Sequence, residues 1–117
     1  MSYDIYLLDP ITKERIGFDL YHHCTGGTYQ VGGTNKAWLN IKWNYAKYYY
    51  QYFGEKGIRT IYGMTGAESI PVLQSVIKKL GNDTNPDYWT ATEGNAKAPL
   101  LQLVAFAQMR PDGEGVS

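Results

Sequence analysis

Residues 36–67 read KAWLNIKWNYAKYYYQYFGEKGIRTIYGMTGA, and this aromatic stretch decides the fold. It contains two of the three tryptophans and more than half of the 11 tyrosines in the chain. Apolar and polar residues alternate from residue 37 to residue 44, a period of two that predicts a half-buried β-strand. The residues expected on its apolar face are Ala37, Leu39, Ile41 and Trp43.

A short helix is predicted over residues 45–53, directly after this strand, because the period of the pattern changes after Asn44. Asn44 is a suitable N-cap, and Gly54 is a suitable glycine at the C-terminal end. One face of the helix carries Tyr45, Tyr48, Tyr49 and Tyr52. A tyrosine buries its ring but needs a partner for its hydroxyl. The rings either pack on the sheet or, in part, stack on a planar ligand.

Glycines punctuate residues 54–67, and a short strand is predicted between them at 58–62. Arg59 lies in this segment, and a guanidinium can hold a phosphate or carboxylate with two parallel hydrogen bonds. The alternative role for Arg59 is a surface ion pair with Glu55 or Glu68.

A β-hairpin is predicted at the start of the chain. Residues 3–8 and 15–20 both alternate, and Asp9-Pro10 favours a turn between them. With the strand after Lys36, these segments predict an α+β fold with an antiparallel sheet of about four strands.

Two longer helices follow the aromatic stretch. The first begins at a capping box formed by Thr65 and Glu68 and runs to about Leu80. Ser69 is the alternative cap, because Pro71 delays regular hydrogen bonding. The second is expected to begin at Asn95 rather than at the threonines before it, because Pro99 is best tolerated in a first turn.

The last helix, residues 95–109, is apolar most of the way round. Its core face carries Leu100, Leu103, Val104, Phe106 and Ala107, and its back face carries Leu101, Ala105 and Met109. Full burial of one helix is hard to arrange in a domain this small. We therefore expect a homo-oligomer that uses the back face of this helix.

Length and charge exclude several classes of protein. We expect a single domain over residues 1–117 with a short flexible tail from about residue 111. The formal net charge is zero, which argues against binding to duplex nucleic acid. No segment has the roughly 20 apolar residues of a membrane span, and the N-terminus does not resemble a signal peptide. With Cys24 as the single cysteine, we expect a cytoplasmic protein without membrane partners.

No catalytic or metal site is expected. The only histidines, His22 and His23, are neighbours of Cys24, and adjacent residues on a strand face opposite ways. No nucleophile stands beside a base in a signature, and the carboxylates are scattered. We therefore predict a non-catalytic protein without a cofactor. The alternative, an enzyme, would need Cys24 or His23 inside a cleft.

Anion sites are suggested by two Gly-Gly steps, at residues 26–27 and 32–33, whose backbone N–H groups can approach a ligand. Tight turns explain the same glycines equally well. Lys97 adds a charge near the start of the last helix, where free N–H groups favour anions. The ligand-binding residues that we predict are Trp38, Tyr45, Tyr49, Arg59, Lys97, Gly27 and Gly33.

Three segments carry a resemblance to a family of small uncharacterised proteins of bacterial phages and prophages. They are GGTYQVGGTNKAWLNIKWNY (26–45), FGEKGIRTIYGMTGAESIPVL (53–73) and TEGNAKAPLLQLVAFAQMRPDG (92–113). The resemblance covers the chain from about Asp4 to Gly113. It implies no particular activity and assigns no catalytic or binding residue.

The expected function follows from this context. Small phage proteins without enzyme motifs are often inhibitors of host defence, and some in other families sequester nucleotide signals. We expect a protein that binds a nucleotide-like ligand in this way. The alternative is an inhibitor that binds a host defence protein, or a phage accessory protein, through an aromatic surface.

Overall fold

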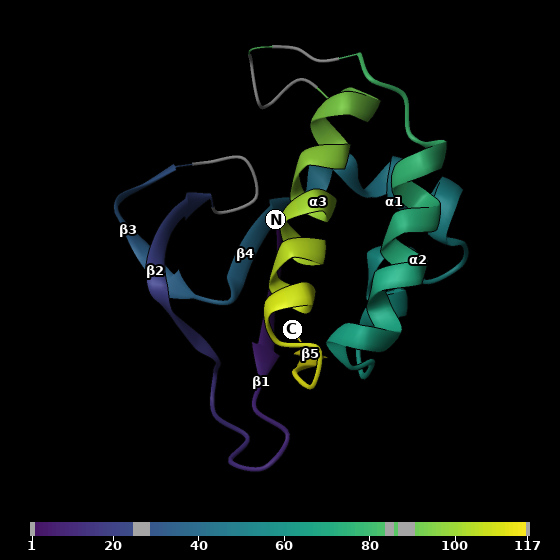
Figure 1. Ribbon diagram of the computed structural model, residues 1–117. Coiled ribbons are helices and arrows are strands. Elements are labelled where there is room, and N and C mark those ends of the chain that lie inside the picture. Colours follow the sequence, from purple (N-terminus) through teal and green to yellow (C-terminus); the bar gives the residue numbers. More distant parts are fainter. Residues whose placement is uncertain (1, 25–28, 84–85, 87–90, 117) are drawn as a thin grey trace.

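The fold is α+β, and Figure 1 shows the strands on one side of the molecule and the helices on the other. The computed structural model describes residues 2–24, 29–83, 86 and 91–116. In those residues the strands are β1 (Ser2–Leu8), β2 (Gly17–Cys24), β3 (Tyr29–Lys36), β4 (Trp38–Lys42) and β5 (Glu114–Val116). The α-helices are α1 (Ala46–Phe53), α2 (Gly66–Lys79) and α3 (Glu93–Met109), and two 3₁₀ helices are η1 (Trp43–Tyr45) and η2 (Gly57–Ile61).

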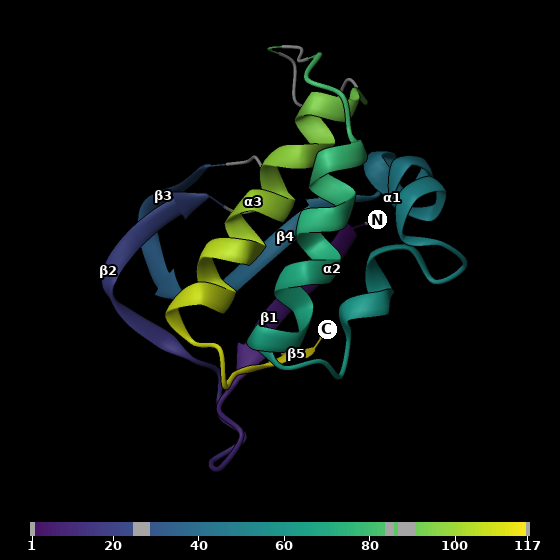
Figure 2. The same ribbon diagram turned by 45° about the vertical axis from the view of Figure 1, so that its right-hand side comes forward.

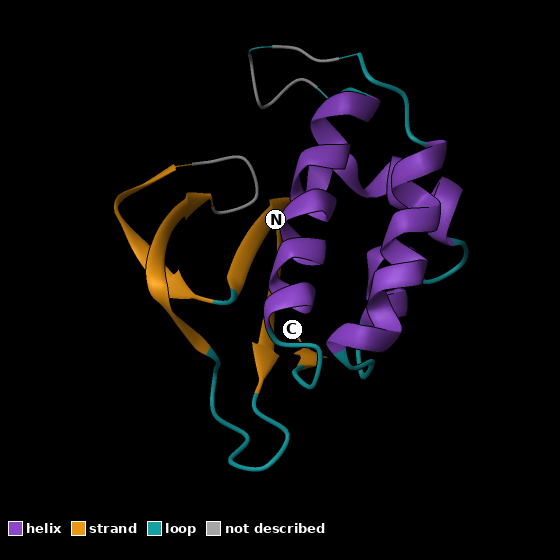
Figure 3. Cartoon of the chain, viewed as in Figure 1, coloured by secondary structure: helices purple, strands orange, loops and turns teal. Residues whose placement is uncertain are grey.

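The described strands form two separate antiparallel sheets, so the prediction of one sheet of about four strands is wrong. A three-stranded sheet has the order β4-β1-β5, and β2 pairs only with β3 in the second sheet. Figure 3 shows β2 and β3 standing apart from the other strands. In the first sheet Tyr3 lies opposite Ile41, and Ile5 lies opposite Leu39.

The two strands of the predicted hairpin pair with each other only next to the loop that joins them. Leu8 bridges Arg15, and the Ile16 N–H donates a 2.9 Å hydrogen bond to the Leu7 carbonyl. Beyond that point β1 pairs with β4. Alternation identifies which face of a strand is apolar, but it does not identify the partner strand. Pairing β1 with β4 places Ile5 and the apolar residues of β4 on one buried face.

The helices cover one face of the three-stranded sheet. In Figure 2, α2 and α3 lie side by side in front of β1 and β4. The core between these layers includes residues from every one of these elements: Ile5, Leu39, Ile41, Tyr49, Leu73, Val76, Leu100, Val104 and Phe106. The predicted core faces of the strand after Lys36 and of the last helix are therefore confirmed for their described side chains.

The tyrosine helix forms as predicted, although its start differs. Tyr45 and Tyr49 are fully buried, while Lys47 is exposed. Asn44 is not the N-cap, because η1 continues directly into α1 and Tyr45 occupies the cap position, where its side chain does not cap the first turn. Gly54 ends α1 with a φ of 106°, a conformation that favours glycine.

The strand predicted at 58–62 is wrong, because this segment contains η2. A 3₁₀ helix has three residues per turn, so Ile58 and Ile61 share one face, and both are buried. The glycines at the two ends, Gly57 and Gly63, have φ values of 58° and 84°. They allow the chain to turn sharply into and out of η2.

The caps of the longer helices were only partly predictable. The capping box of α2 is confirmed, with Glu68 N donating to Thr65 Oγ1 and Thr65 N donating to Glu68 Oε1. However, α3 begins after Thr92, whose hydroxyl accepts from the Asn95 N–H at 3.1 Å. Pro99 therefore lies in the second turn, where it is buried.

Two tyrosines of α1 explain the extra turn of α3. The Tyr48 hydroxyl donates to the Ala91 carbonyl at 3.0 Å, and the Tyr52 hydroxyl donates to Glu93 Oε1 at 2.8 Å. These tertiary contacts hold the start of α3 against α1. They outweigh the helix-breaking tendency of Pro99, which local sequence rules emphasise.

The chain from about residue 111 is not a flexible tail as far as residue 116. Residues 114–116 form β5 and pair with β1, with Leu7 opposite Gly115. Arg110 holds the turn before β5 through two hydrogen bonds to Asp112 and one to Asp9. The turn thereby fastens the end of α3 to the loop that follows β1.

Candidate functional site

The structure does not bring the seven predicted ligand-binding residues together. Tyr45 and Tyr49 have no exposed surface, so neither ring can stack on a ligand. The Tyr49 hydroxyl donates to the Ala96 carbonyl at 2.8 Å inside the core. For these two residues, the alternative that the rings pack in the interior is confirmed, and the stacking role is wrong.

Other predicted residues lie apart or outside the described part of the chain. Lys97 lies on α3, where its ammonium donates to the Asn82 side chain and is attracted by Glu93. Gly33 lies in β3, and the backbone of Trp38 lies in β4, but the Trp38 side chain and the whole of Gly27 are outside the described residues.

Arg59 lies on the surface in η2, beside the end of α1. Its Nε donates to the Lys56 carbonyl and its Nη2 donates to the Tyr50 hydroxyl, both at 3.3 Å. Within the described part of the chain, Arg59 makes no ion pair with Glu55 or Glu68. The guanidinium is thus held in place by neutral partners, and its charge is not neutralised by a carboxylate.

Tyr50 supplies an exposed aromatic ring next to this guanidinium. The side chain is 37% exposed. Its ring lies over Gly57, where an added Cβ would stand only 3.2 Å from Tyr50 Cδ1 and Cε1. Gly57 also has a φ of 58°. A glycine at this position therefore serves both the turn into η2 and the close approach of the ring.

Tyr3 of β1 holds Tyr50 by its hydroxyl. The two hydroxyls are hydrogen bonded, and burial, with Tyr50 close by, raises the pKa of Tyr3 to about 12. The positive charge of Arg59 acts in the opposite direction on this pKa. Tyr3 is consequently neutral at ordinary pH, and the positive charge of the group comes from Arg59. We call the exposed side chains of Tyr50 and Arg59, with Gly57 beneath the ring, the Tyr50–Arg59 surface.

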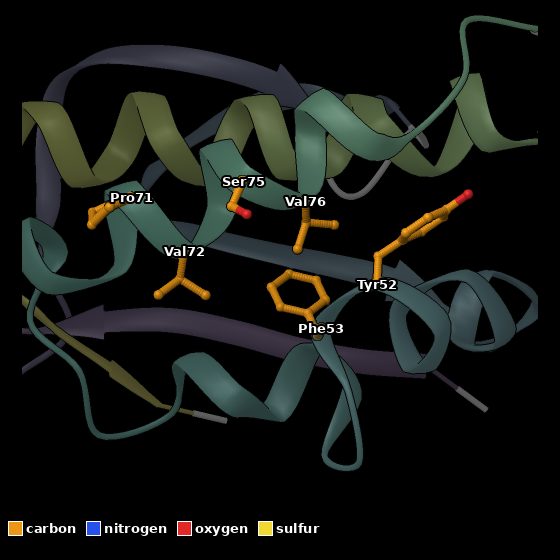
Figure 4. Close-up of a pocket in the computed structure, with 6 residues that line it drawn as sticks. All are labelled: Tyr52, Phe53, Pro71, Val72, Ser75 and Val76. Atoms are coloured by element: carbon orange, nitrogen blue, oxygen red, sulfur yellow. The ribbon is translucent and has the colours of Figure 1, made fainter.

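A second feature is an open pocket between α1 and α2, drawn in Figure 4. It has a volume of about 360 Å³ and is lined by Tyr52, Phe53, Pro71, Val72, Ser75 and Val76. Figure 4 shows the Phe53 ring facing Val72 and Val76 across the gap. The lining is mainly apolar, so the pocket suits an apolar group.

Glu93, the first residue of α3, is hydrogen bonded both to α1 and to the residue Gly81 that follows α2. Its Oε1 accepts from the Gly81 N–H at 3.0 Å and from the Tyr52 hydroxyl at 2.8 Å. These two hydrogen bonds, with the charge of Lys97, hold the pKa of Glu93 below its usual value. The carboxylate therefore stays ionised as a structural acceptor and fixes the orientation of the Tyr52 ring beside the pocket.

Sequence reasoning identified Arg59 but missed Tyr50 and Gly57. A helical wheel could have identified Tyr50, because it is the one tyrosine of residues 45–52 that lies off the tyrosine face. A tyrosine off the buried face of a helix is exposed. The proximity of Tyr50 to Arg59 depends on η2, which the sequence pattern did not predict.

Comparisons with models of protein families, with curated proteins and with solved structures returned no match for this chain. In the described residues, no group of three or more His, Cys, Asp or Glu side chains is placed to hold a metal ion. None of the helices in that part of the chain has the length and apolar character needed to cross a membrane.

Proposed function

We propose that this is a non-catalytic protein that binds a small anionic ligand with a planar group, of the nucleotide kind, at the Tyr50–Arg59 surface. The observation that carries the proposal is the guanidinium of Arg59, held by Lys56 O and Tyr50 Oη beside an exposed aromatic ring. A base stacks on a tyrosine face, and a guanidinium pairs with phosphate oxygens.

The geometry supports this chemistry because the two groups are already oriented. A guanidinium has five N–H donors in one plane, and the two hydrogen bonds of Arg59 use only two of them. The remaining donors are available to an anion. Gly57 and Tyr3 fix the ring from beneath and from the side. Less side-chain freedom is therefore lost on binding than for two unsupported side chains.

The resemblance to phage proteins supports a role for this binding. A phage protein that sequesters a nucleotide signal in the cytoplasm of its host would blunt a defence response. The zero net charge of the chain favours a small ligand over a nucleic acid. We also propose that the protein works as a homo-oligomer joined through residues 95–109, the part of the chain that forms most of α3.

The test is native mass spectrometry of the purified protein with a panel of cyclic nucleotides, followed by calorimetry with any that binds. Arg59→Ala and Tyr50→Ala should each weaken binding at least tenfold. Arg59→Ala should not lower the melting temperature by more than a few degrees, because this side chain is exposed. Tyr50→Ala should lower it further, because it also removes the ring that packs on Gly57 and the hydrogen-bond partner of Tyr3. Lys79→Ala is the matched control, since it removes an exposed positive charge on α2.

Two outcomes would overturn the nucleotide proposal. One is a panel in which no nucleotide adds mass to the protein. The other is a nucleotide that binds Arg59→Ala as tightly as it binds the unaltered chain, which would place the ligand elsewhere.

A second candidate function is a protein-binding inhibitor, and the pocket between α1 and α2 favours it. An apolar side chain of a partner fits a pocket of about 360 Å³ lined by Phe53, Val72 and Val76. Ser75→Arg would place a charged side chain over this pocket and should abolish capture of a host protein. Gln74→Arg, at the adjacent exposed position, is the control. Equal capture by both variants would exclude the pocket as the docking site.

A further inference from the structure

The exposed face of α3 is apolar and uncharged from Leu101 to Met109. Leu101 and Met109 are 52% and 53% exposed, and Ala105 lies between them, one turn from each. These positions are spaced by four residues, so they form one stripe on the helix. In Figure 1, α3 crosses in front of β1 and β4.

The stripe is symmetric about Ala105. Leu101 and Met109 lie four residues before and after it, and Gln102 and Gln108 lie three before and after it. At about 100° per residue, the first pair stands about 40° to either side of Ala105 and the second pair about 60°. The residue types match within each pair. A helix of this kind presents the same surface when it is turned end over end.

We infer that two copies of this chain associate through this stripe, with their α3 helices antiparallel across a two-fold axis at Ala105. The inference rests on the self-association proposed above and specifies its geometry. Each Leu101 would contact Met109 of the second copy, with the i, i+4 rows of the two helices lying along each other. Ala105 would meet its own equivalent, where a small side chain allows the helices to approach closely.

The absence of charge on this stripe favours a second copy of the chain as the molecule that covers it. From Ala98 to Met109, no charged residue occurs in the sequence, so two identical faces do not repel each other. The charged neighbours Lys97 and Arg110 are held within their own chain, by Asn82 and by Asp9 and Asp112. An isologous contact requires a self-complementary surface, and this stripe provides one.

The size of the face sets the expected strength. A single helix face is smaller than the roughly 800 Å² per partner of a standard stable interface. The dimer should therefore depend on concentration and dissociate in the micromolar range. Sedimentation velocity over concentrations from about 1 to about 200 μM should show a shift from monomer to dimer.

A charge exchange tests the register of the pair. Leu101→Glu and Met109→Lys should each weaken the dimer at least tenfold, because each buries a charge without a partner. The chain carrying both substitutions should recover most of the association, since residue 101 of one copy would face residue 109 of the other. These positions are about 12 Å apart along one helix, so they cannot pair within a chain.

A cross-link tests the two-fold axis directly. Ala105→Cys in a Cys24→Ser background should form a disulfide-linked dimer under mild oxidation, whereas Gln74→Cys on α2 in the same background should not. Failure of the double variant to recover, or equal cross-linking at both positions, would overturn the antiparallel arrangement. A protein that remains monomeric at about 200 μM would overturn the dimer. Nucleotide affinity, measured separately, tests the Tyr50–Arg59 proposal independently of these results.

Discussion

The hydroxyl of Tyr49 donates a 2.8 Å hydrogen bond to the carbonyl oxygen of Ala96, joining α1 to α3 across 47 residues of sequence. Both residues are fully buried. Tyr48 and Tyr52 make similar contacts to the residues at the start of α3. The tyrosine face of α1 therefore serves to position α3, and the phenol oxygens find their partners on its backbone and on Glu93.

Tyr49→Phe should lower the free energy of unfolding by about 1 kcal/mol, because it removes one buried hydrogen bond while keeping the ring. Urea unfolding measures this change. Nucleotide binding should be unchanged in Tyr49→Phe. A large loss of affinity would contradict this and would show that Tyr49 takes part in ligand binding.

Gly57→Ala should lower both stability and ligand affinity. An alanine at a φ of 58° costs about 1–2 kcal/mol, and its Cβ would push the Tyr50 ring from its place. Gly63→Ala is the matched control, since it has a φ of 84° but no atom within 4 Å of the added Cβ. Both variants should unfold at lower urea concentration. Only Gly57→Ala should weaken nucleotide binding, and equal affinities in the two variants would contradict the role of the ring.

Thr65→Ala should destabilise the protein by about 1 kcal/mol, because it removes the side-chain half of the capping box of α2. Thermal unfolding followed by circular dichroism measures the effect. Ser75→Ala, at an exposed position in the middle of α2, should cause no loss. A Thr65→Ala variant as stable as the unaltered chain would show that tertiary packing alone holds the start of α2.

Arg110 should make stability depend on pH in the acid range. Its guanidinium is the main cause that lowers the pKa of Asp112, whereas the pKa of Asp9 is lowered first by the Thr12 and Ile11 N–H groups and then by Arg110. A lowered folded-state pKa adds stability above the ordinary value of 3.8. That stability is lost as pH falls through the folded-state pKa.

The measurement is urea unfolding of the Arg110→Gln variant at pH values from about 7 to about 2. The variant should be less stable at neutral pH, and the difference from the unaltered chain should shrink below about pH 4. Lys79→Gln removes the same charge from an exposed position of α2 and should keep the original pH dependence. A difference that stays constant with pH would show that Arg110 acts through packing instead of through the two carboxylates.

Local patterns predicted the elements better than their partners. The alternation around Leu39 and Ile41, the tyrosine face of α1 and the capping box at Thr65 all appear in the structure as expected. Each depends on residues within one or two turns of each other. The pairing of β1 with β4, the separation of β2 and β3, and the role of residues 114–116 depend on distant segments.

The candidate site shows the same division. Local sequence pattern was enough to expect Arg59 on the surface among glycines and an apolar face on α3 opposite its core. The burial of Tyr45 and Tyr49 and the position of Tyr50 beside Arg59 depend on contacts between distant segments. The reason is physical: periodicity records which side of an element is apolar, whereas the neighbour that covers that side is chosen by packing between segments far apart in the chain.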